Sequence, residues 1–290
     1  MTHVAVLVGP AIEYLSIRPD GTYVDATFGA GGHSRAILER LRGGRLIAID
    51  ADPAAAARAA EIDDRRFSFT VANFRGIADV LDRCSIAQVD GVLFDLGISS
   101  MQIEDAERGF SLGKRAPLDM RMNPKIGRSA YEILTTASER ELVDIFYSYG
   151  EERSARRIAR AVVVRRESGT LPSTAAEFAQ LVAGVVQRRG KRERIHPATR
   201  VFQALRIAVN DELDALREGL LGAIGRLRGA GRLVAISFHS LEDRIVKQTL
   251  RDDARVDVLT KRPVRAAEEE LAANRRARSA KLRAAQRKVS

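Results

Sequence analysis

The stretch Asp25-Ala26-Thr27-Phe28-Gly29-Ala30-Gly31-Gly32 (DATFGAGG) decides the fold of this 290-residue chain. It continues a short apolar run, Thr22–Ala26, that predicts a buried strand, and it precedes a predicted helix from Ser34 to about Leu41. Glycines at a strand-to-helix turn let the chain turn tightly and let a ligand approach the backbone. The stretch therefore predicts the first βα unit of a parallel sheet, with a ligand at the sheet edge.

The same rhythm continues outward from this turn. Further strands are predicted at Arg45–Ile49, Phe67–Val71 and Val89–Phe94, with helices between them. From about Asp105 to Asn210 the pattern indicates helices and loops, and a strand pattern returns at Arg232–Phe238. We therefore predict an α/β fold with a mostly parallel, doubly wound sheet, interrupted by an inserted all-helical domain. The predicted domains are 1–104, 105–210 and 211–290, the last ending in an exposed, partly helical basic tail.

The residues around the glycine turn predict a nucleoside-containing cofactor. Asp50 ends the next strand, where a carboxylate can accept hydrogen bonds from ribose hydroxyls. A dinucleotide fingerprint starting at Gly29 would have glycine or alanine at position 34, where Ser34 stands. This favours S-adenosylmethionine over NAD, with Gly29, Gly31 and Gly32 beside the cofactor. Phe74 follows the third strand, where an adenine would lie; its alternative role is that of a core aromatic.

The fourth strand delivers polar groups to the same edge of the sheet. Asp95 ends the strand, and Ser99 follows shortly after. Methyl transfer depends largely on positioning the nucleophile, and a carboxylate could also accept a proton from an amine. Asp95 and Ser99 are therefore candidate catalytic residues, with helix capping as the alternative for Asp95. His239, after the returning strand, is a candidate base or phosphate ligand, next to a predicted capping box of Ser240 and Asp243.

The positive charge of the chain is concentrated in two segments. The net charge is +10, and residues 151–206 hold thirteen basic against five acidic side chains, while residues 261–290 hold ten against three. Such clustering favours a polyanionic partner, although solvated arginine faces are the alternative. The candidate nucleic-acid contacts, which would be RNA contacts if the polyanion is RNA, are Arg153, Arg156, Arg157, Arg160, Arg188, Arg189, Lys191 and Arg192.

Composition also excludes several classes of protein. One cysteine, Cys84, allows neither an intrachain disulfide nor a CxxC zinc motif, and we expect no metal site. The sequence contains no apolar run of membrane-spanning length and no basic signal-peptide start. We expect a soluble, cytoplasmic protein.

The sequence resembles a known family, the small-subunit (16S) ribosomal RNA cytosine-N4 methyltransferase H family, of the MraW type. The resemblance extends in order over nearly the whole chain. The matching stretches are TFGAGGHS (27–34), AIDADP (48–53), DLGISS (95–100), DAERGFS (105–111), PLDMRM (117–122), YSYGEE (147–152), HPATRVFQALRIAVNDEL (196–213), ISFHSLEDR (236–244) and ARSAKLR (277–283). The chain departs from the family at Ala5, where proline is usual, and at Asn274-Arg275-Arg276, where Asn-Pro-Arg is usual.

The resemblance implies a class I Rossmann-like methyltransferase whose inserted helical domain helps to hold RNA. Its implied product is N4-methylcytidine in the decoding region of 16S ribosomal RNA, with the small ribosomal subunit as partner. The implied cofactor contacts are Gly31, Gly32, His33, Asp50, Phe74, Asp95 and Gln102.

Three rival interpretations remain open. One is a methyltransferase that acts on another base or on DNA, and a second is an RNA-binding ribosome-assembly factor that keeps the fold without turnover. The third, a nicotinamide oxidoreductase, is disfavoured by Ser34. The sequence leaves the oligomeric state open.

Overall fold

The computed structural model describes residues 5–186 and 196–289. Contacts within the chain divide it into two compact units. Unit 1 comprises residues 1–97 and 213–290, and unit 2 comprises residues 98–212.

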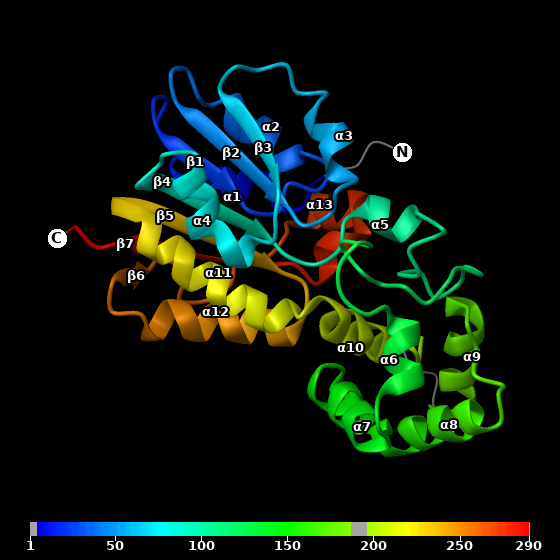
Figure 1. Ribbon diagram of the computed structural model, residues 1–290. Coiled ribbons are helices and arrows are strands. Elements are labelled where there is room, and N and C mark those ends of the chain that lie inside the picture. Colours follow the sequence, from blue (N-terminus) through cyan, green and yellow to red (C-terminus); the bar gives the residue numbers. More distant parts are fainter. Residues whose placement is uncertain (1–4, 187–195, 290) are drawn as a thin grey trace. The chain divides into compact units, whose positions relative to one another are not determined.

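Unit 1 is built on a seven-stranded sheet with the order β3-β2-β1-β4-β5-β7-β6 (Figure 1). Strands β1 to β5 run parallel to one another, whereas β7 is antiparallel to both β5 and β6. The predicted mostly parallel sheet is confirmed. The strands are β1 (Thr22–Asp25), β2 (Arg45–Asp50), β3 (Phe67–Val71), β4 (Val89–Asp95), β5 (Leu227–Ser237), β6 (Val256–Val258) and β7 (Lys281–Arg287).

Helices cover both faces of this sheet, as the doubly wound prediction requires. On one face α1 (Val8–Leu15) and α2 (Gly32–Leu38) pack into an apolar core with residues of β1, β4 and β5. Figure 1 shows α4, α11 and α12 on the other face. The remaining elements of unit 1 are α3 (Ala55–Ala59), η1 (Phe74–Gly76), α4 (Ile77–Arg83), α11 (Glu212–Arg226), α12 (Ser240–Asp252), α13 (Glu268–Ala273) and η2 (Arg275–Arg278).

The central strand β4 explains why the sheet edge carries the polar groups. Its residues from Val89 to Phe94 are all buried, as expected for a parallel strand covered on both faces. The first partly exposed residue is Asp95, at the carboxyl end. Parallel strands present their carboxyl ends at one edge, which is where open α/β sheets bind ligands.

The prediction of an exposed C-terminal tail was wrong. Strand β7 lies between β5 and β6, and Leu282, Ala284 and Ala285 are fully buried. The misjudgement arose because this stretch is poor in large apolar residues, although small alanines suit a strand that is covered on both faces. The basic side chains Lys281 and Arg283 both form ion pairs with Asp243 of α12, at 3.1 and 2.7 Å.

Strand β5 also begins earlier than predicted. It starts at Leu227, directly after α11, and not at Arg232. The register of its pairing with β4 shifts between Val89 and Gly91, which accommodates the glycine-containing segment before Arg232.

Unit 2 has its own apolar core. The core gathers residues such as Leu118, Phe146, Phe178 and Leu205 from across the unit. Its helices are α5 (Ser100–Glu104), α6 (Ala130–Thr136), α7 (Glu139–Ser148), α8 (Ala155–Glu167), α9 (Ala175–Val186) and α10 (Thr199–Asn210). Among the residues that the structure describes in either unit, no helix is long and apolar enough to cross a membrane.

Candidate functional site

The glycine turn after β1 requires glycine both for its backbone angles and for its packing. Gly29 and Gly31 have φ angles of 54° and 79°, in the left-handed region that favours glycine. A Cβ at Gly31 would lie 2.8 Å from Cζ of Phe28, and one at Gly32 would lie 2.7 Å from Cβ of Ala5. The turn therefore leaves no room for side chains at these two positions.

Asp50 lies directly beside this turn, at the end of β2. One carboxylate oxygen accepts a hydrogen bond from the Gly29 N–H at 2.7 Å, and the other accepts one from the Asp52 N–H at 2.8 Å. Burial raises the pKa of Asp50 to about 6, although both of these hydrogen bonds oppose the shift. A carboxylate with lone pairs left over can accept hydrogen bonds from ligand hydroxyls, as the sequence predicts.

Asp95, at the carboxyl end of β4, is a strongly perturbed carboxylate at the edge of the sheet. Its backbone N–H donates to Oγ1 of Thr27 at 2.6 Å, which joins the end of β4 to the glycine turn. Its Oδ1 is buried and has no hydrogen-bond partner among the described residues. Burial raises the pKa of Asp95 to about 7; Arg276 opposes this shift and Glu242 adds to it. A buried, unpaired acceptor of this kind suits a ligand that donates a hydrogen bond.

His33 connects Asp95 with a second buried carboxylate, Asp25. Nδ1 of His33 lies 3.5 Å from Oδ2 of Asp95, and its Nε2 lies 3.1 Å from the carbonyl oxygen of Val6. Asp25 is fully buried and accepts hydrogen bonds from the Ser34 hydroxyl at 2.7 Å and the Thr27 N–H at 3.2 Å. Burial lowers the pKa of His33 and raises that of Asp25, while each group's charge works against the other's shift.

Phe74 begins the short helix η1 and packs within unit 1. Its ring meets Phe94 of β4 edge to face, with the centroids 5.6 Å apart, and Gly219 of α11 lies against its backbone and ring. The ring is half-buried, so it serves the packing of unit 1 and retains a surface that an adenine could contact.

His239 is the N-cap of α12, a role that the sequence analysis assigned to Ser240. Its Nδ1 accepts a hydrogen bond from the Glu242 N–H at 3.4 Å, and Oε2 of Glu242 accepts one from the N–H of His239 at 3.3 Å. The predicted capping box of Ser240 and Asp243 is therefore wrong by one residue. Asp243 instead pairs with the basic side chains of β7.

Ser99 and Gln102 form the capping box of α5 in unit 2. The Gln102 N–H donates to Oγ of Ser99 at 3.2 Å, and Oε1 of Gln102 accepts from the N–H of Ser99 at 2.9 Å. Both side chains thus satisfy the backbone at the start of this helix.

The four predicted arginine contacts Arg153, Arg156, Arg157 and Arg160 are all exposed; three lie on α8, and Arg153 lies directly before it. Two of them have partners within unit 2, since Arg157 donates to the Val185 carbonyl at 2.6 Å and Arg160 pairs with Glu139 at 3.2 Å. The other predicted contacts lie outside the described residues: Arg188, Arg189, Lys191 and Arg192.

Sequence reasoning missed four residues that shape this site. Asp25 and Thr27 stand in the quoted stretch, and their position at the end of a strand was a usable signal. Glu270 and Arg276 lie in the C-terminal stretch, where nothing in the local pattern indicates proximity to Asp95. Oε1 of Glu270 accepts a hydrogen bond from the N–H of Leu7 at 2.7 Å.

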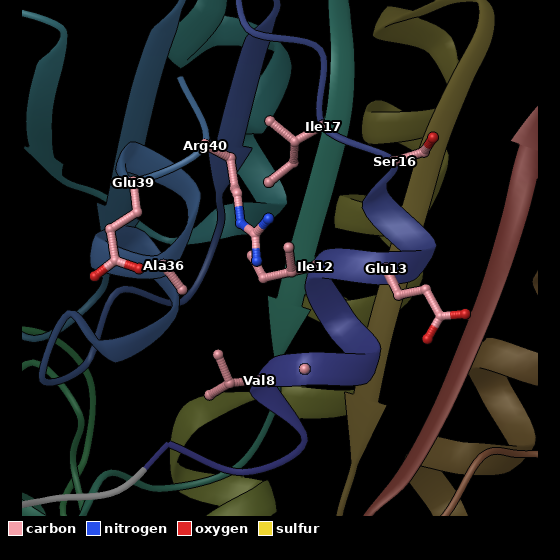
Figure 2. Close-up of a pocket in the computed structure, with 9 residues that line it drawn as sticks. Val8, Ile12, Glu13, Ser16, Ile17, Ala36, Glu39 and Arg40 are labelled. Carbon is pink, nitrogen blue, oxygen red and sulfur yellow. The ribbon is translucent and has the colours of Figure 1, made fainter. Parts of the chain in front are cut away.

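A pocket between α1 and α2 lies apart from these carboxylates. Figure 2 shows Val8, Ile12 and Ile17 around it, with the charged side chains Glu13 and Arg40. The residues that line it include none of Asp25, Asp50 and Asp95, so the pocket is not part of the candidate site.

Comparisons with known proteins show the family of the chain. A family model described as the MraW methylase family matches residues 1–288. A protein of Thiobacillus denitrificans named ribosomal RNA small subunit methyltransferase H is 48% identical, over 98% of this chain and 97% of that protein. Relatives with the same name in Azoarcus sp. and Thermomicrobium roseum are each 49% identical over 99% of this chain, covering 97% and 94% of their own lengths.

Proposed function

The chain belongs to the MraW methylase family, and from that premise we propose that it methylates N4 of a cytidine in 16S ribosomal RNA. Its broader activity, S-adenosylmethionine-dependent methylation of small-subunit ribosomal RNA, follows from the family and from the names of its relatives. The predictions of a methyltransferase and of this cofactor are confirmed. The base, the position and the decoding region are our proposals.

The residues present at the sheet edge fit the cofactor. At Gly31 and Gly32 the turn offers a ligand backbone groups alone, and the space of a Cβ is already filled by Phe28 and Ala5. Asp50 keeps lone pairs for ribose hydroxyls, and Phe74 offers a partly exposed ring. When bound, S-adenosylmethionine supplies an electrophilic methyl group.

One observation carries the choice of an amine as the acceptor, namely the buried, unpartnered Oδ1 of Asp95. An exocyclic amine has protons to donate, and its lone pair is delocalised into the base. A carboxylate that holds an amine proton orients the nitrogen and favours its rehybridisation as the new bond forms. With its pKa near 7, Asp95 can accept that proton at physiological pH.

The direct test is the transfer of labelled methyl to small ribosomal subunits from cells that lack this protein, followed by nucleoside mass spectrometry. Label in N4-methylcytidine supports the proposal. Label in another nucleoside would replace cytidine N4 with that acceptor. The protein could instead bind the RNA and transfer no labelled methyl, even though other methyltransferases can modify the same subunits. That result would favour the assembly-factor interpretation. Running naked 16S RNA in parallel identifies the physical form of the substrate.

We also propose that the exposed arginines of α8 contact RNA phosphates. Arg156 lies on this helix and Arg153 lies directly before it, and both residues are exposed. Each arginine that neutralises a phosphate contributes about one unit to the slope of log affinity against log salt. Changing Arg153 or Arg156 to Gln should therefore lower the slope by about one, while Arg83→Gln, an exposed change in unit 1, should leave it unaltered. An unchanged slope in all three variants would remove α8 from the RNA surface.

A further inference from the structure

We propose that His33 and Asp95 form a proton relay, in which the carboxylate of Asp95 receives the amine proton and Nδ1 of His33 receives the proton that Asp95 gives up. The inference rests on the proposed methylation of an exocyclic amine. In it Asp95 is the catalytic residue, since it touches the base, and His33 acts through Asp95.

The hydrogen-bond partner of His33 determines which of its ring nitrogens carries the hydrogen. Nε2 lies 3.1 Å from the carbonyl oxygen of Val6, and a carbonyl can only accept. Nε2 is therefore the N–H of the neutral ring, and Nδ1 has a free lone pair. That lone pair lies 3.5 Å from Oδ2 of Asp95, close enough to shorten to a hydrogen bond once substrate is bound.

The ring is held in this orientation from the side of Val6. The neighbouring N–H of Leu7 donates to Oε1 of Glu270 at 2.7 Å, which ties the segment before α1 to α13. The side chain of His33 is only 5% exposed, and Val6 is also buried. Residues distant in sequence therefore fix both the tautomer and the position of Nδ1.

Four charged groups from different elements act on the pair. Asp25 of β1 and Glu270 of α13 face His33, and both favour its imidazolium form. Arg276 of η2 and Glu242 of α12 act on Asp95 in opposite directions. The carboxylate of Asp25, which accepts two hydrogen bonds, is thus placed to stabilise a proton that arrives on the ring.

The relay balances atoms and charge. A bond forms between the amine nitrogen and the methyl carbon, the bond from that carbon to sulfur breaks, and its electron pair stays on sulfur. The nitrogen then releases one proton to Asp95, and one proton passes from Asp95 to Nδ1 of His33. The imidazolium returns its proton to solvent after turnover. Because the ring can take a proton from Asp95, the relay works whether Asp95 starts ionised or protonated.

The variant His33→Gln isolates the relay from the structural role of the ring. Its amide N–H can still donate to Val6, but it offers no basic nitrogen to Asp95. At saturating S-adenosylmethionine, where a change in cofactor affinity does not limit the rate, we expect single-turnover methyl transfer to small subunits at pH 8 to fall roughly tenfold. His196→Gln, the same change at a histidine whose Nδ1 accepts from the N–H of Ala198, is the matched control.

The pH profile separates a relay from a packing effect. In wild type the rate should decline only when His33 itself is protonated, below its ordinary pKa of 6.5, because burial lowers that pKa. In His33→Gln the decline should begin at the pKa of Asp95, about 7, since Asp95 must then start ionised. The ratio of variant to wild-type rate should drop a further tenfold or so between pH 8 and pH 6. Identical midpoints in the two proteins would overturn the relay and leave the methylation intact.

A second measurement decides the inference even if no methyl reaches cytidine. In nitrogen-15 spectra of the full-length protein, Nδ1 of His33 should be unprotonated at pH 8 and should shift as Asp95 titrates near pH 7. The shift should disappear in Asp95→Asn. A protonated Nδ1, or a titration that Asp95→Asn leaves unaltered, would overturn the relay independently of the substrate.

Discussion

Two stretches of unit 1 meet at Asp95, and they differ in how much of their role the sequence reveals. Residues 25–34 place His33 beside this carboxylate, and residues 268–287 bring Glu270 to Leu7 and Arg276 into electrostatic reach. The first stretch can be recognised from sequence, because a strand-end aspartate followed by closely spaced glycines is typical of a ligand-binding turn. The second is mostly alanine, arginine and glutamate, which fit almost any exposed segment.

The difference shows what a local pattern can and cannot encode. The left-handed backbone at Gly31 is a local requirement, and the glycine that meets it can be read directly from the sequence. The burial of β7 comes from β5, β6 and the covering helices, which lie elsewhere in the chain. Its small residues are buried by their neighbours and not by their own hydrophobicity.

The largest effect that would sharpen this comparison is expected in β7. Ala284 is fully buried, and an unpaired carboxylate there should cost more than about 4 kcal/mol, a large part of the stability of a typical domain. Ala284→Asp should therefore give little folded protein by circular dichroism and thermal unfolding. Ala272→Asp, an exposed change in α13, should fold normally. A folded, stable Ala284→Asp would restore the description of this stretch as an exposed tail.

The next largest effect concerns the carboxylate where the two stretches meet. Asp95→Asn should lower single-turnover methyl transfer by about 10²- to 10⁴-fold, since the amide cannot accept a proton, and change cofactor affinity little. Asp257→Asn, on an exposed position of β6, is the control. Unchanged methylation by Asp95→Asn would remove Asp95 from the mechanism.

A smaller effect should appear in the pH dependence of stability. The pKa of Asp95 is raised to about 7 in the fold, so its contribution is most favourable below pH 3.8 and is lost as the pH rises through 7. Compared with wild type, ligand-free Asp95→Asn should gain on the order of 2 kcal/mol of unfolding free energy between pH 5 and pH 8. Denaturant unfolding at the two pH values measures this.

A substitution in residues 268–287 tests how the C-terminal stretch acts on Asp95. Arg276→Gln removes the cation that opposes the raised pKa of Asp95, so it should make the loss of stability with pH steeper. Arg278→Gln, an exposed change in the same turn, should follow wild type. Parallel curves for all three proteins would separate the C-terminal stretch from Asp95.

The smallest effect is expected in the glycine turn. Gly31→Ala requires a left-handed φ of 79° and places a Cβ 2.8 Å from the Phe28 ring, which should cost about 1–2 kcal/mol and weaken cofactor binding. Gly9→Ala, where a Cβ would meet nothing within 4 Å, is the control, measured by thermal unfolding and calorimetry. Equal stability and affinity of the two variants would mean that the turn tolerates a side chain.

Much of the fold could be predicted from sequence because parallel strands and their helices leave periodic marks. The strands around Val24, Ile47 and Leu93 were located from their apolar runs, and Asp50 and Asp95 were placed at strand ends from the same pattern. What sequence could not supply was pairing across long separations. The N-cap at His239 was also missed, because a histidine ring in that role has no local signature beside the serine that follows it.

The order of the strands has a consequence for how the protein is made. On the ribosome, β4 is complete at Asp95, and 131 further residues are made before Leu227, the residue at which its partner β5 begins. Until then, four finished strands present an open edge, and the intervening helical unit has time to collapse on its own core. The sheet closes only when β7, the last strand synthesised, slides between β5 and β6. We expect nascent chains that stop before Lys281 to be substrates for chaperones and not short versions of the enzyme.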